Sequence, residues 1–243
     1  MVTKNQTKLI ISLHQKKYRN KHSLFIAEGI KVIQELINSK LQLHEIYCTN
    51  KTVFEEARVD FQLISEKELK KISALTTPNN ALALFKIPEP QKIDTNGLIL
   101  VLDDIRDPGN LGTIIRLCDW FGIKDLVCSN ETVDCYNTKV VQATMGSLAR
   151  VNITYTDISD FIKNSDLPSY AATMNGTNVY KSSLPSPGIL VMGNESNGVS
   201  EKVQEIIDHQ ITIPRFGDLK KTESLNVATA TAIMLSEFSK NFE

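Results

Sequence analysis

At 243 residues the chain is long enough for one large domain or two small ones, each with a real core. No apolar run approaches the roughly 20 residues that cross a bilayer, and the N-terminus lacks the apolar region of a secretory signal. We therefore expect no membrane association and a cytoplasmic location. The net charge of −1 does not by itself indicate a nucleic-acid binder.

The four cysteines and four histidines are scattered along the chain. The cysteines form no C-x-x-C pair, and the histidines form no H-E-x-x-H motif. This spacing disfavours a zinc site or a disulfide framework, so we expect no metal and free thiols in a reducing compartment.

The distribution of charge is uneven, because residues 1–40 hold eight lysines and arginines against the acids Glu28 and Glu35. Such a local excess can follow a phosphate backbone, and an ordinary solvated helix face is the alternative. The predicted RNA-binding residues are the bunched cations Lys16, Lys17, Arg19 and Lys21.

The first part of the chain reads as a small α/β domain over residues 1–88. Its expected helices cover residues 3–20, 30–37, 53–59 and a segment that begins after Ser65, where Ser65 and Glu68 form a capping box. Its expected strands cover residues 43–48, 61–64 and 81–85. Residues 89–97 are mostly polar and read as a linker to a second domain over residues 98–243.

Residues 97–123 form the central unit of the second domain. An unbroken apolar run over 98–102 is typical of a strand that is buried on both faces of a parallel sheet. Turn residues at 107–110 follow, and a helical period then runs to Gly122, which is placed as a C-terminal cap. Strand, glycine-containing loop and helix form the point of an α/β sheet where ligands usually bind.

Arg116 falls away from the apolar stripe of this helix, on the same face as Gly112. Helical side chains lean towards the N-terminus, so Arg116 is expected to reach over Gly112 towards Asn110. A guanidinium near the N–H groups of a helix start suits an anionic or electron-rich group. The alternative is an ordinary exposed helix arginine.

Strands and helices alternate through the rest of the chain, which predicts a parallel sheet. The further strands are expected at 126–128, 148–154, 170–174, 188–192 and 210–213, and the helices at 137–146, 159–164, 200–207 and 224–238. The loops that follow the strands should gather along one edge. Neither G-x-G-x-x-G nor G-x-x-x-x-G-K-[ST] occurs, so dinucleotide and P-loop sites lose their main support.

Three of these loops together closely resemble the motifs of the SpoU/TrmH family of RNA 2′-O-ribose methyltransferases, within the SPOUT superfamily. They are Asn110-x-Gly112-x-x-x-Arg116, Gly193-Asn-Glu-x-x-Gly198 and Ser224-Leu-Asn226-Val-Ala. The resemblance extends over 98–243. It is looser in the N-terminal part, where Phe25-Ile-Ala-Glu28-Gly29 and the basic segment before it resemble the family's small L30e-like substrate-binding domain.

The resemblance implies an α/β domain with a deep trefoil knot, a homodimer, and S-adenosylmethionine (SAM) as cofactor. By chain-folding rules alone a knot would not be proposed, since chains avoid threading loops. The residues expected to hold the cofactor are Thr173, Met174, Asn175, Gly176, Met192, Gly193, Ile213 and Leu225.

The implied catalytic set is Arg116 together with Asn110, Glu195, Ser224 and Asn226. Arginine is a poor general base because its pKa lies above about 12, so stabilising a developing alkoxide or gripping the adjacent phosphate suits Arg116 better. Glu195 is the only carboxylate of the motifs that offers itself as a base, and the family analogy favours a structural or cofactor-shaping role for it.

The implied function is SAM-dependent 2′-O-methylation of a structured RNA, and the additional N-terminal domain favours ribosomal RNA of the 23S type over tRNA. A non-catalytic RNA-binding or ribosome-assembly protein on the same fold is the alternative. The loop over 215–223 is longer than in the shortest family members, and its Arg215, Lys220 and Lys221 either touch RNA or remain solvated. Trp120 either stacks on a base or fills a core or a subunit contact.

Overall fold

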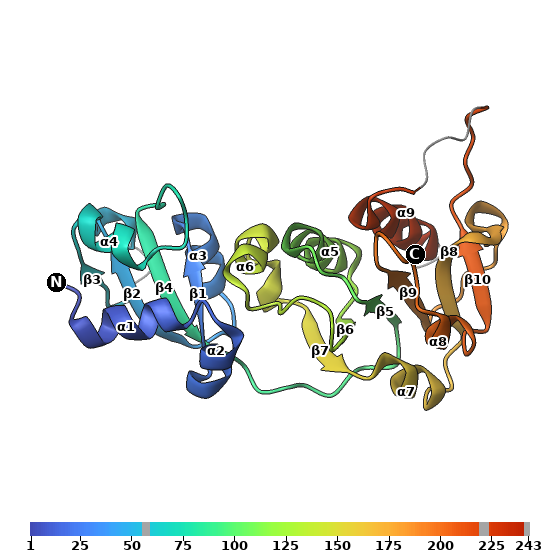
Figure 1. The fold of residues 1–243 in the computed structure, drawn as a ribbon, viewed down its shortest axis with the longest axis horizontal. Helices are drawn as coiled ribbons and strands as arrows, with labels where there is room; N and C mark the ends of the chain where they lie inside the picture. The colour runs from blue at the N-terminus through green and yellow to red at the C-terminus, as the bar shows by residue number, and fades with distance from the viewer. Residues whose placement is uncertain (55–58, 219–223, 241–243) are drawn as a thin grey trace. The chain divides into compact units, whose positions relative to one another are not determined.

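The computed structural model describes residues 1–54, 59–218 and 224–240, with the side chain of Val53 left out. The chain forms two compact units (Figure 1). The first comprises Met1–Glu89 together with Asp134–Ala149, and the second comprises Pro90–Val133 together with Arg150–Glu243. No helix in the described part of the chain is long and apolar enough to cross a membrane.

The first unit is built on a four-stranded sheet in the order β1-β4-β2-β3. Its strands are β1 (Leu24–Glu28), β2 (Leu43–Cys48), β3 (Gln62–Leu63) and β4 (Ala81–Lys86). β4 runs antiparallel to both β1 and β2, while β2 and β3 are parallel. The predicted strands at 43–48 and 81–85 are confirmed, and the predicted strand at 61–64 is shorter.

Helices and short 3₁₀ turns complete the first unit. They are α1 (Lys4–Ser12), α2 (Lys16–His22), α3 (Ile30–Ile37), η1 (Lys51–Val53), α4 (Glu66–Ile72), α6 (Thr138–Thr144) and η2 (Ser147–Ala149). The predicted capping box is confirmed, since the Ser65 side chain accepts from the Glu68 N–H and the Glu68 carboxylate accepts from the Ser65 N–H. Residues 55–58 of the helix predicted over 53–59 lie outside the described residues.

The single helix predicted over residues 3–20 is wrong, because the chain breaks between α1 and α2. Thr3 caps α1 with a second capping box, and Leu13 ends it. The guanidinium of Arg19 then turns back and donates to the carbonyl oxygens of Leu13 and His14, at 2.9 and 3.0 Å. These bonds satisfy carbonyls that the break removes from the helical ladder.

The edge strand β1 is buried on both faces. Leu24 and Ile26 belong to a core that includes Ile10 and Leu13. Between them, Phe25 points to the opposite face and packs against the ring of Tyr136, with ring centroids 4.9 Å apart. Segment Asp134–Ala149 therefore belongs to the first unit by its packing, although it follows a strand of the second unit in sequence.

The second unit contains a six-stranded sheet in the order β10-β8-β9-β5-β6-β7, and all of its neighbouring strands are parallel. The strands are β5 (Leu98–Asp103), β6 (Asp125–Ser129), β7 (Asn152–Thr156), β8 (Ser169–Asn178), β9 (Gly188–Gly193) and β10 (His209–Thr212). The predicted parallel sheet is confirmed. β7 begins later than expected, because Ser147–Ala149 forms a 3₁₀ turn.

Helices cover both faces of this sheet (Figure 1). They are α5 (Pro108–Phe121), α7 (Ile158–Lys163), η3 (Val179–Lys181), α8 (Glu201–Gln204) and α9 (Val227–Ser239). α7 and α8 contribute Ile158, Ile162 and Val203 to a core with alternate residues of β5 and β9. α5 and α9 pack against each other and against the sheet. β5 is buried along its whole length, as its uninterrupted apolar sequence predicts.

All four cysteines are buried, and none forms a disulfide. Burial raises the pKa of the Cys48 and Cys118 thiols above the ordinary value, so neither is activated as a nucleophile. Among the described residues no group of His, Cys, Asp and Glu is arranged to hold a metal ion.

Candidate functional site

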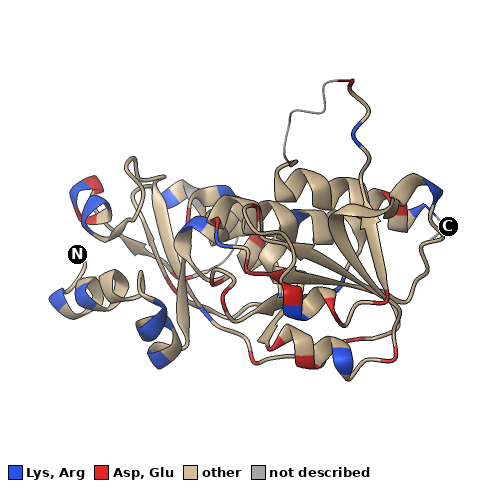
Figure 2. Ribbon diagram, turned by 45° about the vertical axis from the view of Figure 1, so that its right-hand side comes forward, with Lys and Arg blue, Asp and Glu red and all other residues tan. Residues whose placement is uncertain are grey.

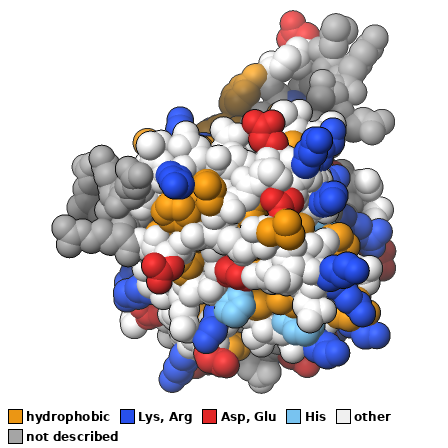
Figure 3. All heavy atoms as spheres, turned by 90° about the vertical axis from the view of Figure 1, so that its left-hand side faces the viewer, with side chains coloured by type: hydrophobic (Ala, Val, Ile, Leu, Met, Phe, Trp, Pro, Cys, Tyr) orange, Lys and Arg blue, Asp and Glu red, His pale blue; other side chains and the backbone are white. Residues whose placement is uncertain are grey.

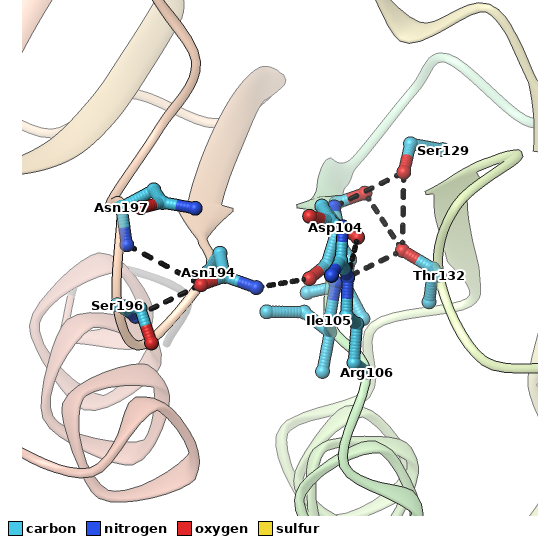
Figure 4. A network of polar contacts seen from close by, with 9 residues as sticks. Asp104, Ile105, Arg106, Ser129, Thr132, Asn194, Ser196 and Asn197 are labelled. Carbon is cyan, nitrogen blue, oxygen red and sulfur yellow. Dashed lines mark hydrogen bonds and ion pairs between the residues drawn. The ribbon is translucent and has the colours of Figure 1, made fainter.

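The loop between β5 and α5 is held in a tight, specific shape. Asp104 adopts a left-handed backbone with φ of 57°, which is uncommon for a residue other than glycine. Its N–H donates to the Ser129 hydroxyl at 3.0 Å, and the N–H of Ile105 donates to the Thr132 hydroxyl at 3.2 Å (Figure 4). These bonds from the loop after β6 offset the local strain.

Helix α5 begins immediately after this loop. Asp107 is its N-cap and accepts from the Asn110 N–H at 2.8 Å, and Pro108 occupies the first helical turn, where its missing N–H costs nothing. Gly122 ends the helix in the left-handed conformation with φ of 70°, as predicted. Arg116 lies on the exposed side of α5, and no hydrogen bond or ion pair holds it within the described chain.

The turn after β9 carries the second motif. Gly193 allows close chain contact, because a Cβ there would lie 2.2 Å from the backbone of Gly198. Asn194 and Gly198 exchange backbone hydrogen bonds of 3.0 and 2.8 Å. The Asn194 side chain accepts from the N–H groups of Ser196 and Asn197 and donates to the carbonyl oxygen of Asp104 at 2.7 Å (Figure 4). This last bond joins the turn to the β5–α5 loop.

A chain of side-chain hydrogen bonds connects all three motifs, and Asn110 is its centre. The Asn110 amide donates to a Glu195 carboxylate oxygen at 2.5 Å, and its own oxygen accepts from the Asn226 amide at 2.9 Å. Glu195 and Asn226 are separated from Asn110 by 85 and 116 positions in sequence. The structure thus brings Asn110, Glu195 and Asn226 together at the carboxyl edge of the parallel sheet.

Asn226 also starts α9, where its side-chain oxygen accepts from the N–H groups of Ala228 and Thr229. α9 therefore begins at Val227, three residues later than the helix predicted over 224–238. Ser224 and Leu225 lie in the exposed segment before the helix, and no hydrogen bond joins Ser224 to the other predicted catalytic residues among the described contacts.

The predicted cofactor residues lie at the carboxyl ends of neighbouring strands. Thr173, Met174, Asn175 and Gly176 lie in the middle of β8, Met192 and Gly193 end β9, and Ile213 follows β10. Gly176 is required by close packing, since a Cβ there would lie 2.5 Å from the backbone of Gln210 and Ile211. Met174 and Leu225 expose nearly half of their apolar side chains, at 48% and 46%.

The predicted RNA-binding cations do not form one group. Lys16, Lys17 and Lys21 are exposed on α2, and Figure 2 marks Lys and Arg positions in blue along the helices near the N-terminus. Arg19 differs from these lysines, because its side chain is 2% exposed and forms an ion pair with Asp134. Four of the five N–H donors of this guanidinium are already engaged by the partly buried Asp134 carboxylate and the two carbonyls, and its burial keeps it from a phosphate on the surface.

Sequence patterns did not identify the residues whose hydrogen bonds hold the β5–α5 loop and the end of β5 in place. Asp103 ends β5 and accepts from the Ser200 N–H at 2.8 Å, and Asn194 and Ser129 hold the loop at Asp104. The available signals were weak, since a polar residue at the end of a buried strand is common. Trp120 is 83% exposed on α5, so it does not fill the core of the chain.

Comparisons with known proteins agree with this arrangement. The family model described as the SpoU rRNA Methylase family matches residues 97–236, and the model described as an MRM3-like substrate binding domain matches residues 4–83.

Among curated relatives, a 23S rRNA (guanosine(2553)-2′-O)-methyltransferase from Bacillus subtilis is 29% identical over 230 residues, covering 92% of this chain and 91% of the relative.

Two solved structures resemble the chain over nearly its whole length. A putative RNA methyltransferase of the TrmH family from Porphyromonas gingivalis has a TM-score of 0.90 and 36% identity, with 98% of each chain covered. An rRNA methyltransferase from Sinorhizobium meliloti with bound AdoMet has a TM-score of 0.86 and 28% identity, covering 100% of this chain and 97% of the other.

Proposed function

The chain belongs to the SpoU rRNA methylase family, and we propose that it transfers a methyl group from SAM to a ribose 2′-hydroxyl of large-subunit ribosomal RNA. The observation that carries this proposal is the hydrogen-bonded chain Glu195–Asn110–Asn226. It gathers three separate loops at the edge of a parallel sheet, where ligands of such folds bind. The name of the Bacillus subtilis relative supports rRNA, and a guanosine within it, as the substrate.

The residues at the strand ends fit the proposed cofactor. Met174 and Leu225 offer exposed apolar surface for an adenine ring, and Thr173 and Asn175 add polar groups beside it. We place Gly176, Met192, Gly193 and Ile213 in the same cradle. Bound there, SAM supplies a sulfonium methyl group that is already activated for transfer.

The protein must then position the ribose hydroxyl in line and favour its deprotonated form. We assign Arg116 to the substrate, because its cationic side chain is free of partners within the described chain and stands on α5, the helix whose first turn contains Asn110. There it stabilises the developing alkoxide or binds the adjacent phosphate, and the proton leaves to that phosphate or to water.

Glu195 has an ordering role in this proposal. One of its carboxylate oxygens already accepts the Asn110 amide, which fixes the turn after β9 to the start of α5. Asn226 fixes the start of α9 in the same way, and Ser224 and Leu225 precede it directly. The network thereby orders the elements that border the cofactor and the substrate.

The first unit supplies RNA binding through its exposed lysines, which include Lys16, Lys17 and Lys21. We also propose a homodimer, for which the 83% exposed Trp120 on α5 offers an apolar contact. Four buried cysteines without a disulfide suit a reducing compartment, so we place the enzyme in the cytoplasm.

Mass-spectrometric mapping of 2′-O-methylated nucleotides in rRNA and tRNA, with and without the gene, tests this function. We expect one methylation to disappear from a single position of the large-subunit rRNA and to return when the gene is restored. If a methylation disappears from a tRNA instead, the substrate is that tRNA and not rRNA. No change in either RNA would favour the non-catalytic RNA-binding alternative.

A further inference from the structure

A broad groove of about 1360 Å³ lies on the first unit, between the helix pair α1–α2 and helix α4. Val2 and Leu9 form part of its floor, and both pack on the core of this unit. Because every lining residue belongs to the first 71 positions, the groove is complete within the first unit.

The groove is strongly basic, because three helices turn lysines towards it. α1 contributes Lys4 and Lys8, α4 contributes Lys67 and Lys71, and α2 contributes Lys21. The pairs on α1 and α4 are each four residues apart, so each pair shares one helix face. Figure 3 views this end of the molecule and shows basic side chains gathered along one side of the face.

These five lysines are exposed, and no ion pair neutralises any of them within the described chain. Glu68 is the only carboxylate among the described residues of the lining. It is already committed, since it accepts from the N–H groups of Val2 and Ser65 at 2.9 and 3.0 Å and from the Ser65 hydroxyl. The groove therefore has an excess of available positive charge.

The groove also contains surface that suits a nucleobase. Ile11 is 48% exposed and lies one turn from Lys8, and the ring of Tyr18 and the imidazole of His22 line the side formed by α2. Aromatic rings beside cations are the usual arrangement for single-stranded or looped RNA, whose bases stack while lysines contact the phosphates.

We propose that this groove binds the phosphodiester backbone of the RNA substrate, with Lys4, Lys8, Lys21, Lys67 and Lys71 as the phosphate contacts. The inference rests on the proposed function, because it takes the occupant to be the RNA that is methylated. The sequence predicted RNA contacts only at Lys16, Lys17, Arg19 and Lys21, here called the α2 cluster. The proposal places the contact surface between α1, α2 and α4 instead. RNA is favoured over an acidic protein segment, because the aromatic and imidazole rings suit bases as well as phosphates.

The α2 cluster by itself offers fewer available cations to RNA than the groove does. Arg19 is buried against Asp134, and the Lys17 ammonium lies 6.0 Å from the ring centroid of Tyr18. Of the four predicted cations only Lys21 lines the groove, where it joins the lysines of α1 and α4. A backbone that follows the groove would meet cations on both walls.

Filter binding of the full-length protein to in vitro-transcribed 23S rRNA, at several salt concentrations, tests the proposal. The variant combines Lys8→Ala, Lys67→Ala and Lys71→Ala, and its matched control combines Lys31→Ala, Lys40→Ala and Lys86→Ala, which are exposed lysines of the same unit outside the groove. For three lost phosphate contacts the slope of log K against log salt should fall by about 2, and affinity should fall at least tenfold. The control should change affinity less than twofold.

Equal affinity and equal salt dependence for the groove variant and its control would overturn the proposal. Thermal unfolding should give the same transition for both variants and the wild type, which verifies that the first unit retains its fold. If the wild type binds the rRNA through the groove but transfers no methyl group, the groove assignment stands and the proposed function fails. If an acidic peptide such as polyglutamate competes with the wild type as well as polyuridylate at equal charge, the groove is a general anion surface and the RNA assignment is rejected.

Discussion

The carboxyl edge of the second unit and the basic groove of the first unit use polar residues in opposite ways. At the sheet edge, Asn110, Glu195 and Asn226 bind one another, so their hydrogen-bonding capacity is spent largely inside the protein. In the groove, the lysines have no partners among the described residues and remain available to a ligand. The sheet edge holds its side chains in fixed positions, whereas the groove leaves its positive charges available to attract an anionic ligand.

This difference predicts that substitutions in the two regions affect different measurable quantities. Changes at the sheet edge should affect the rate at saturating RNA, because a catalytic arrangement depends on placement within a fraction of an ångström. Changes in the groove should affect RNA affinity and its salt dependence, because lysine contacts to phosphate are long-ranged and tolerant of geometry. Arg116 has features of both regions, because it is a cation without a partner among the described residues and stands on α5, the helix that carries Asn110.

Arg116→Ala should have the largest effect. If Arg116 stabilises charge on the substrate, its loss should lower kcat by about 100-fold or more, equivalent to roughly 3 kcal/mol. The measurement is transfer of a labelled methyl group from SAM to in vitro-transcribed 23S rRNA, with SAM binding followed by calorimetry. Lys124→Ala, an exposed cation of the same unit, is the control. A parallel loss of SAM affinity would assign Arg116 to the cofactor instead.

Arg19→Ala should mainly reduce stability. Removing one partner of a buried ion pair costs about 3–5 kcal/mol, because the Asp134 carboxylate would remain without its cation. Urea denaturation should show this loss, while Lys17→Ala on the same helix should change the free energy of unfolding by less than about 0.5 kcal/mol. If the Arg19→Ala variant keeps the wild-type stability but binds RNA more weakly, Arg19 contacts RNA as the sequence predicted.

Asn110→Ala should disconnect the three motif loops without unfolding the chain. The loss of two internal hydrogen bonds, each worth about 1 kcal/mol, should lower kcat by up to about 30-fold if both are needed for placement of the loops. A double-mutant cycle with Glu195→Ala should show that the two effects are not additive. Asn164→Ala, which removes only a bond to the Asp160 carbonyl, serves as the control. Full additivity would mean that the network does not act as a unit.

Glu68→Gln should have the smallest effect and concerns the single carboxylate in the groove. Hydrogen bonds from Ser65 and Val2 lower the pKa of Glu68 from 4.5 to about 2. The carboxylate therefore stabilises the folded state above its unfolded pKa, and this contribution is lost as the pH falls from 4.5 towards 2. Thermal unfolding should differ between the wild type and the variant at pH 6 and converge near pH 2. RNA affinity should stay within twofold, because the carboxylate is already engaged by the protein; a large gain would show that it repels RNA.

Local sequence rules predicted many of the elements correctly. The Ser65–Glu68 capping box, the Gly122 cap and the buried strand β5 depend on neighbouring residues alone, so their patterns were sufficient. The break between α1 and α2 was missed, because it is completed by the Arg19 guanidinium on the carbonyls of Leu13 and His14. The trefoil knot and the homodimer remain predictions.

The sequence by itself determined the family and the motif residues, since their order and spacing are fixed along the chain. Tertiary structure decided what these residues contact. In sequence Arg19 cannot be distinguished from the lysines beside it, but in the fold it is buried and paired with Asp134, 115 positions away. The groove lysines of α1 and α4 are separated by some 60 residues, and only the packing of the two helices makes them one surface. Local patterns specify helices, strands and caps, whereas burial and charge pairing depend on partners that the fold brings from distant positions.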